Sequence, residues 1–113
     1  VTVTLTVAAE AADNIDVTIQ CKDEWGNNIA SVRLLDVILT TTAAAVAFTA
    51  NTYTITATVG AVVEGVANKV LKVLTNASGA ATIRLNNVGA VTCFMGVLLN
   101  NRKPSMSATI THV

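Results

Sequence analysis

Chemistry in this chain would have to be built from one imidazole and two thiols, namely His112, Cys21 and Cys93. A hydrolytic triad needs a nucleophile, a base and an orienting acid brought together by the fold. We predict that His112, next to the C-terminal residue, lies on the polar side of its strand as a solvated or interface histidine. Cys93 would then meet it only by accident of folding. These residue types predict a protein that is not an enzyme and has no catalytic residues.

Cys21 and Cys93 lie far apart in the sequence, and both fall on the apolar phase of alternating segments. A disulfide would form only if those two segments face each other. Buried free thiols are the more common outcome in a chain without a secretion signal. A zinc site needs about four Cys, His or carboxylate ligands, and the chain has too few of the soft ones.

Oxygen ligands for a hard cation such as calcium are concentrated near the start of the chain. They are Asp13, Asn14, Asp16, Asp23, Glu24 and Asn27. Their spacing does not match an EF-hand loop. Because Asp and Asn also form turns without any metal, we predict neither a metal site nor a cofactor.

Three side chains on predicted turns are candidates for contact with a partner protein. Trp25 either caps one end of the core or contacts a partner, since Trp is enriched in interface hot spots. Arg102 and Lys103 lie on a polar turn, where they are solvated or, in an assembled shell, meet an acidic patch on a neighbour.

The elements that would position these residues are short strands. Period-two alternation of apolar and polar residues, typical of strands with one buried face, runs through four segments. They are residues 1–7, 15–22, 52–59 and 81–86. Residues 91–99 are apolar in both phases, which predicts a strand covered on both sides.

Further strands are predicted from shorter or less regular patterns. Residues 32–40 form an apolar run broken by Arg33 and Asp36, residues 70–74 form a second run, and residues 106–110 close the chain. Turn residues at 76–79 join two of these strands. Residues 41–50 predict a surface loop or a loose edge strand, and Gly60 and Gly65 bracket a candidate hairpin around residues 61–64.

This order predicts an all-β fold, an antiparallel immunoglobulin-like β-sandwich of roughly seven to nine short strands. The 113 residues suffice for a single domain, residues 1–113. Residues 1–10 alternate from the start, so they predict a strand and not a signal peptide. No apolar run approaches the length that spans a bilayer, so no membrane partner is expected.

The composition favours contacts with other proteins. Only 12% of the residues are charged and the formal net charge is zero. Such a chain has no electrostatic footprint for nucleic acid and tends to self-associate. The terminal segments 1–7 and 105–113 lack the charges that usually protect edge strands. We therefore predict a homo-oligomer joined through these strands, with Thr4 and Thr109 at the contact and a trimer favoured by analogy with three-fold positions in capsids.

Two blocks resemble bacterial immunoglobulin-like domains of the invasin and intimin type. Residues 17–30 (VTIQCKDEWGNNIA) are similar to their opening strand, Gly-Asn turn and following strand. Residues 74–85 (LTNASGAATIRL) resemble a later block, in which Asn76 or Ser78 stands where an Asp is usual. The resemblance implies a sandwich fold and carries no catalytic residues.

Residues 89–113 (GAVTCFMGVLLNNRKPSMSATITHV) resemble the closing hairpin of small virion proteins of tailed bacteriophages, including a final Ser-x-x-Ile-Thr strand over residues 107–111. This resemblance implies a capsid decoration or accessory protein, located in virions assembled in the bacterial cytoplasm. Its partners would be the major capsid protein or other virion proteins. The alternative is a binding or spacer module of a tail fibre or bacterial surface adhesin.

Overall fold

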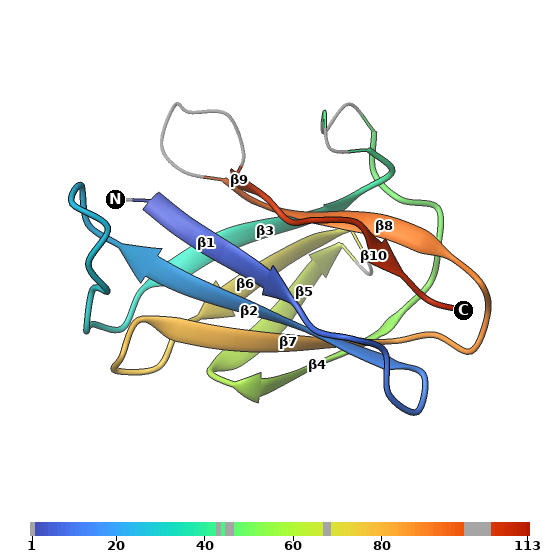
Figure 1. The fold of residues 1–113 in the computed structure, drawn as a ribbon, viewed down its shortest axis with the longest axis horizontal. Coiled ribbons are helices and arrows are strands. Elements are labelled where there is room, and N and C mark those ends of the chain that lie inside the picture. Colours follow the sequence, from blue (N-terminus) through green and yellow to red (C-terminus); the bar gives the residue numbers. More distant parts are fainter. Residues whose placement is uncertain (1, 43, 45–46, 67–68, 99–104) are drawn as a thin grey trace.

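The computed structural model describes residues 2–42, 44, 47–66, 69–98 and 105–113. Ten strands form two antiparallel sheets, and no helix occurs among these residues (Figure 1). The predicted all-β antiparallel sandwich is therefore confirmed. No helix in the described part of the chain has the length and hydrophobicity to span a bilayer.

The smaller sheet has four strands in the order β1–β2–β7–β4. Their bounds are β1 Thr2–Val7, β2 Asn14–Lys22, β7 Ala80–Asn86 and β4 Thr54–Val59. These are the alternating segments of the sequence, because one phase packs into the core while the other meets solvent.

The larger sheet has six strands in the order β10–β8–β3–β6–β5, with β9 also paired to β8. Their bounds are β3 Leu34–Thr40, β5 Ala61–Val66, β6 Val70–Leu74, β8 Thr92–Leu98, β9 Ser105–Met106 and β10 Ile110–Thr111. β3, β5, β6 and β8 carry apolar residues in both phases.

The central pairings are those of an immunoglobulin-type Greek key. β2 pairs with β7 in one sheet, and β3 pairs with β8 in the other. Strands B and E, and C and F, occupy these places in immunoglobulin domains. The segment between β3 and β7 departs from the variable-type order, because β4 joins the smaller sheet before β5 and β6 extend the larger one.

One long bent hairpin, the corner hairpin, joins the two sheets along one side. Its first arm is β4 followed by β5, and its second arm is β6 followed by β7. The first arm changes sheets at Gly60, which has φ +78°. A Cβ on Gly60 would lie 2.3 Å from the carbonyl oxygen of Leu74, so the two arms approach too closely for any other residue.

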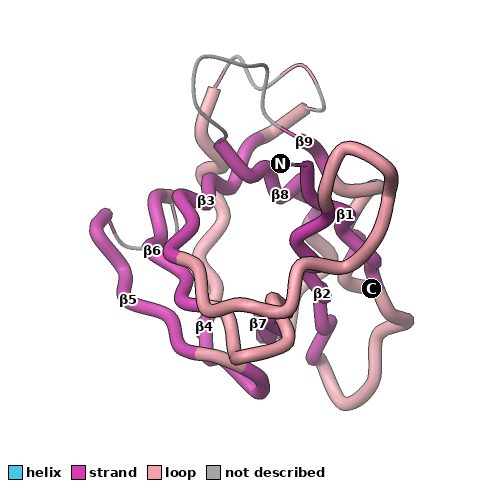
Figure 2. The backbone as a smooth tube through the Cα atoms, turned by 90° about the vertical axis from the view of Figure 1, so that its left-hand side faces the viewer, coloured by secondary structure: helices cyan, strands magenta, loops and turns pink. Residues whose placement is uncertain are grey.

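Figure 2 shows the two sheets end-on, facing each other, and the core side chains come from their inner faces. On the four central strands the fully buried side chains of the core include Val17, Ile19, Ile83, Leu85, Val37, Leu39, Met95 and Val97. Because each comes from one phase of its strand, the other phase of every strand faces outward.

Several local predictions need correction. The predicted hairpin around residues 61–64 is instead the edge strand β5. The closing strand is broken into β9 and β10, because its register against β8 shifts by one residue between them. At the break the Ser107 amide donates to the Met95 carbonyl and the Ser107 hydroxyl accepts from the Met95 amide. The predicted turn at residues 76–79 is confirmed: the Asn76 side chain accepts hydrogen bonds from the Ser78 and Ala80 amides, and Gly79 has a positive φ.

Candidate functional site

The most distinctive surface of the molecule is the side of the larger sheet that faces away from the core, called the outer face below. Its residues are Leu34, Asp36, Ile38, Thr40, Ala61, Val63, Val66, Val70, Lys72, Leu74, Thr92, Phe94, Gly96, Leu98, Met106 and Thr111. Leu34 is 65% exposed and Val63 is 67% exposed. Large apolar side chains at this exposure, grouped on one sheet, mark an interaction site in a soluble protein.

Strand pairing arranges these side chains in rows across the sheet. One row runs Leu98, Asp36, Lys72, Val63, because each is the cross-strand partner of the next. Leu34 and Leu74 form the neighbouring row on one side. All these side chains lie on one surface, since alternate residues of a strand share a face.

Among the described residues of the outer face only Asp36 and Lys72 are charged, and they form an ion pair across β3 and β6 near its centre. Both side chains are about half exposed. An exposed pair of this kind contributes little to folding stability. The ion pair also places one negative and one positive charge at fixed positions among apolar side chains.

The row on the other side of the ion pair is flattened by a glycine. Gly96 is the cross-strand partner of both Ile38 and Met106. A Cβ on Gly96 would lie 2.6 Å from the Met106 sulfur, so Met106 packs over the glycine backbone. Ile38 is buried beside it, which leaves a smooth apolar surface at this end of the outer face.

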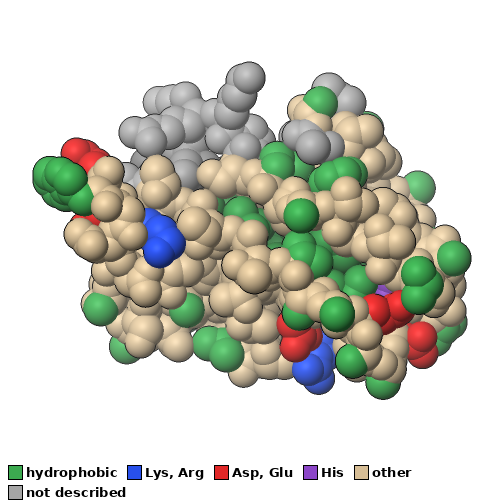
Figure 3. Space-filling view, in the orientation of Figure 1, with side chains coloured by type: hydrophobic (Ala, Val, Ile, Leu, Met, Phe, Trp, Pro, Cys, Tyr) green, Lys and Arg blue, Asp and Glu red, His purple; other side chains and the backbone are tan. Residues whose placement is uncertain are grey.

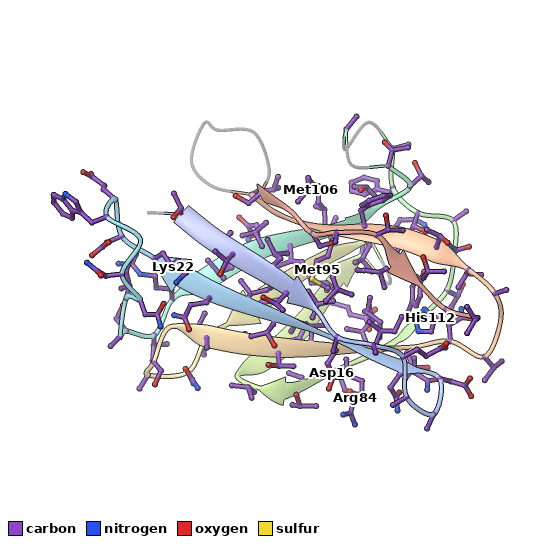
Figure 4. The ribbon with its side chains drawn as sticks, in the orientation of Figure 1. Asp16, Lys22, Arg84, Met95, Met106 and His112 are labelled. Carbon is purple, nitrogen blue, oxygen red and sulfur yellow. The ribbon has the colours of Figure 1, made fainter. Side chains whose placement is uncertain are left out.

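The opposite side of the molecule is polar. Figure 3 views it from β1, β2 and β7, where uncharged polar side chains and backbone predominate. The outward residues of β1 are all threonines, and the central ones of β2 and β7 include Thr18 and Thr82, whose hydroxyls lie 3.2 Å apart. Asp16 and Arg84 form a bidentate ion pair on this side (Figure 4).

Trp25 lies in the connection between β2 and β3, called the Trp25 loop (residues 23–28), and is 82% exposed. The prediction that it caps the core is therefore wrong, and its role as a contact residue stays a prediction. The Asp23 carboxylate accepts hydrogen bonds from the Asn27 and Trp25 amides, which hold the pKa of Asp23 below its usual value. The loop thus presents the indole from a hydrogen-bonded turn.

The prediction that His112 is solvated is wrong, because the side chain is 1% exposed. It shares the phase of Ile110, two residues earlier, which points into the core. His112 Nε2 donates to the Leu85 carbonyl at 3.1 Å, and the ring lies 5.5 Å from the ring of Tyr53 between centroids. Its amide also donates to the Val91 carbonyl, which ties the C-terminus to the start of β8.

Tyr53 connects His112 to Cys93 in what we call the interior cluster. The Tyr53 hydroxyl interacts with Cys93, and burial is the main cause that raises the pKa of both groups. A thiol is nucleophilic only as the thiolate, and both cysteines are free and buried. The cluster therefore holds an unreactive thiol, and its residues pack the core.

The oxygen-rich residues considered for calcium do not converge. Asp16 lies near the start of β2, and Asp23 follows its end. Asp16 is committed to Arg84 and Asp23 to the Trp25 loop. In the described part of the chain no three His, Cys, Asp or Glu residues lie close enough to share a metal ion.

Thr4 and Thr109, the residues predicted at an oligomer contact, are not part of the outer face. Thr4 is exposed on β1, paired with Gln20. Thr109 is exposed but lies between β9 and β10, so it does not belong to a strand. Arg102 and Lys103 lie outside the described residues. β1 is an edge strand as predicted, whereas the broken C-terminal segment offers little continuous edge.

Sequence reasoning missed the outer face, although a signal for it was present. The segments that became β3, β6 and β8 are apolar in both phases, and only the last was interpreted as covered on both sides. All of them lie in the larger sheet, so the phases that do not face the core add up to one surface.

Comparison with known proteins adds no relative. A scan against protein-family models found no match. A search of curated proteins and a search of solved structures also found none.

Proposed function

We propose that this chain is a non-enzymatic structural virion protein that decorates a bacteriophage capsid and stabilises the shell through protein–protein contacts. Its partners would be the major capsid protein, other virion proteins and further copies of itself. The proposal rests on the outer face together with the sequence patterns that resemble tailed-phage virion proteins.

The observation that carries the proposal is that the outer face is apolar at most of its outward positions, with Leu34, Val63 and Val66 more than half exposed, in a chain of which only 12% is charged. Burying apolar surface contributes about 25 cal/mol per Å² before the costs of association are subtracted. Covering this face with a partner protein would lower the free energy of the system. A protein that stabilises a shell by binding to it requires such a favourable contact.

The interior supports a structural role as well. The candidate nucleophile Cys93 and the imidazole of His112 are both fully enclosed by the core. A reaction would need a substrate to reach them through packed side chains. The surface, and not a chemical centre, is therefore where this protein would act.

The test uses particles from the cells that carry the gene. Virions purified on a density gradient are analysed by quantitative mass spectrometry for the ratio of this chain to the major capsid protein. A ratio corresponding to many copies per shell, retained in tail-less shells, is expected. Recovery of the chain only with tails, or only with the bacterial envelope, would contradict decoration.

A second candidate is a binding or spacer module of a tail fibre or bacterial surface adhesin, which the Trp25 loop favours. This loop joins the strands equivalent to B and C of an immunoglobulin domain, and the corresponding loop of antibody variable domains contacts antigen. An exposed Trp on a hydrogen-bonded loop suits that role. Presence of the chain as tandem copies within a longer polypeptide would favour this candidate over decoration.

A further inference from the structure

We propose that the outer face binds the outer face of a second copy of this chain, related by a two-fold axis that lies in the interface and runs between β3 and β6. This inference goes beyond the proposed function, because it concerns contact between copies and needs no shell.

The charges of the outer face are self-complementary about this axis. Asp36 and Lys72 are directly opposite each other on β3 and β6. A two-fold axis parallel to the strands and midway between them places Asp36 of each copy over Lys72 of the other. Each charge thus faces one opposite charge of the other copy, so the interface contains two such contacts and no contact between like charges. Such reciprocal contacts define an isologous two-fold interface.

The same operation matches apolar residues with apolar residues. Leu34 lies over Leu74 of the second copy, because these two are also opposite each other on β3 and β6. Leu98 on β8 lies over Val63 of the second copy on β5, since each flanks the ion pair by one strand. The register of the sheet therefore builds a complementary surface on both sides of the axis.

The geometry is one that sheets adopt readily. An axis parallel to the strands keeps the strand directions of the two sheets aligned, and identically twisted sheets pack in this way at about −30° and about 10 Å apart. At one end of the outer face Gly96 has no side chain and Met106 packs over it, so no large side chain projects there to keep a second sheet away.

The area is sufficient for a weak specific dimer. Four facing strands spaced about 4.8 Å apart, each about six or seven residues long, give a face of roughly 450 Å² per copy, or about 900 Å² in total. Specific interfaces begin near this size, and those below about 1,200 Å² are weak. We therefore expect a dimer with a dissociation constant in the micromolar range.

The test reverses one charge in each of two variants. Asp36→Lys puts two lysines at the centre of the outer face, and Lys72→Asp puts two aspartates there. Each variant alone should dimerise at least about tenfold more weakly than the wild type, because like charges would meet across the axis. A mixture of the two should form a heterodimer about as tight as the wild-type dimer. Sedimentation velocity from about 1 to 100 µM measures all three.

Controls separate this interface from folding and from the other surfaces. Like charges side by side also cost some stability within one copy, so the double variant Asp36→Lys with Lys72→Asp, which restores the pair, should dimerise normally. Asp16→Lys makes the same charge reversal beside Arg84 on the other sheet and should leave the dimer intact. Thr4→Lys with Thr109→Lys should do so too, because they lie at the terminal edge.

The proposal is overturned if the wild type is monomeric at the highest concentration or forms a trimer. It is also overturned if the mixture of variants gives no heterodimer, or if Asp16→Lys or the Thr4 and Thr109 pair of changes abolishes association. A dimer that binds no shell would support this inference and refute decoration. A monomer that binds the shell would refute this inference and support decoration.

Discussion

His112 is a buried polar side chain that is hydrogen-bonded through one ring nitrogen, while its Nδ1 has no hydrogen-bond partner among the described residues. An unpaired buried polar group costs free energy, and here Nε2 donates to the Leu85 carbonyl while the ring packs against Tyr53. The sequence identifies His112 as the one imidazole, but its side chain is buried, which was not predicted from the sequence. Alternation from Ile110 already places His112 in the apolar phase, and the pairing of β10 with β8 turns that phase toward the core.

His112→Ala should lower the free energy of unfolding by about 2–4 kcal/mol, as expected when a large buried side chain is truncated. The neighbouring change Thr111→Ala, at an exposed position of β10, should have an effect within about 0.5 kcal/mol. Urea unfolding of both variants measures the difference. Equal effects would show that His112 does not pack the core in solution.

Acid should weaken the fold in part through Asp16. Its hydrogen bonds with Arg84 hold the pKa of the Asp16 carboxyl below its usual value. A group whose pKa is lower in the folded state stabilises the fold above its unfolded pKa, near about 3.9, and this contribution is lost as pH falls through the folded pKa. The Asp16→Asn variant should be less stable than wild type at pH 7, and the difference should vanish in strong acid.

Thermal unfolding of wild type and Asp16→Asn between about pH 2 and 7 measures this difference. Because the pair is partly exposed, about 1 M salt, which shortens the screening length to about 3 Å, should reduce it. A difference that is constant across this pH range would contradict the assignment.

Among the elements, the periodicity of the sequence correlates with sheet membership for seven of the ten strands. Four segments alternate strictly, and they became β1, β2, β4 and β7, which are all the strands of the smaller sheet. The segments apolar in both phases became β3, β6 and β8 of the larger sheet. The periodicity could therefore predict sheet membership, because it records whether one face or both faces of a strand are apolar.

The corner hairpin could not be predicted in this way. Its first arm is interrupted in sequence by Gly60, which suggests a turn, and residues 61–66 lack a clear period. The structure explains the glycine differently: the chain passes from one sheet to the other there, close to Leu74. A sheet crossing and a tight turn both use Gly at positive φ, so local chemistry does not distinguish them.

Gly60→Ala should therefore destabilise the fold by more than the backbone cost alone. Gly26, in the Trp25 loop, has a similar φ of +81° but nothing within 4 Å of its Cβ position. We expect Gly26→Ala to cost about 1–2 kcal/mol from its left-handed conformation. Gly60→Ala should cost about 3 kcal/mol or more, since the same strain is joined by a clash. Similar unfolding free energies for the two variants would contradict the sheet crossing.

At the scale of the whole molecule, three surfaces differ in chemistry. The outer face is apolar with one central ion pair, the outward side of the smaller sheet is rich in threonine, and the Trp25 loop projects at one end (Figure 1). Composition predicts that partners cover much of the surface. It could not say where, because the grouping of apolar residues on one face arises only when the strands pair.

Trp25→Ala should leave both stability and dimerisation unchanged, because the indole is exposed and belongs to the Trp25 loop, not to a strand of the larger sheet. It should weaken binding to a shell or receptor by about 2 kcal/mol or more if the loop is the external contact. Binding to purified shells and sedimentation of the free protein measure the two effects separately. Loss of the dimer on this change would place the loop in the contact between copies.

The corner hairpin also has a consequence for how the protein folds. Its arms are close in sequence, whereas Asp16 and Arg84, neighbours across β2 and β7, are 68 positions apart. Closing the shorter loop costs less entropy, so we expect the hairpin to form in the folding transition state and carry the two sheets together. Val73→Ala in β6 should then slow folding, and Val3→Ala in β1 should mainly speed unfolding. Stopped-flow kinetics in urea measure both rates, and the opposite pattern would mean that the terminal strands nucleate the sandwich.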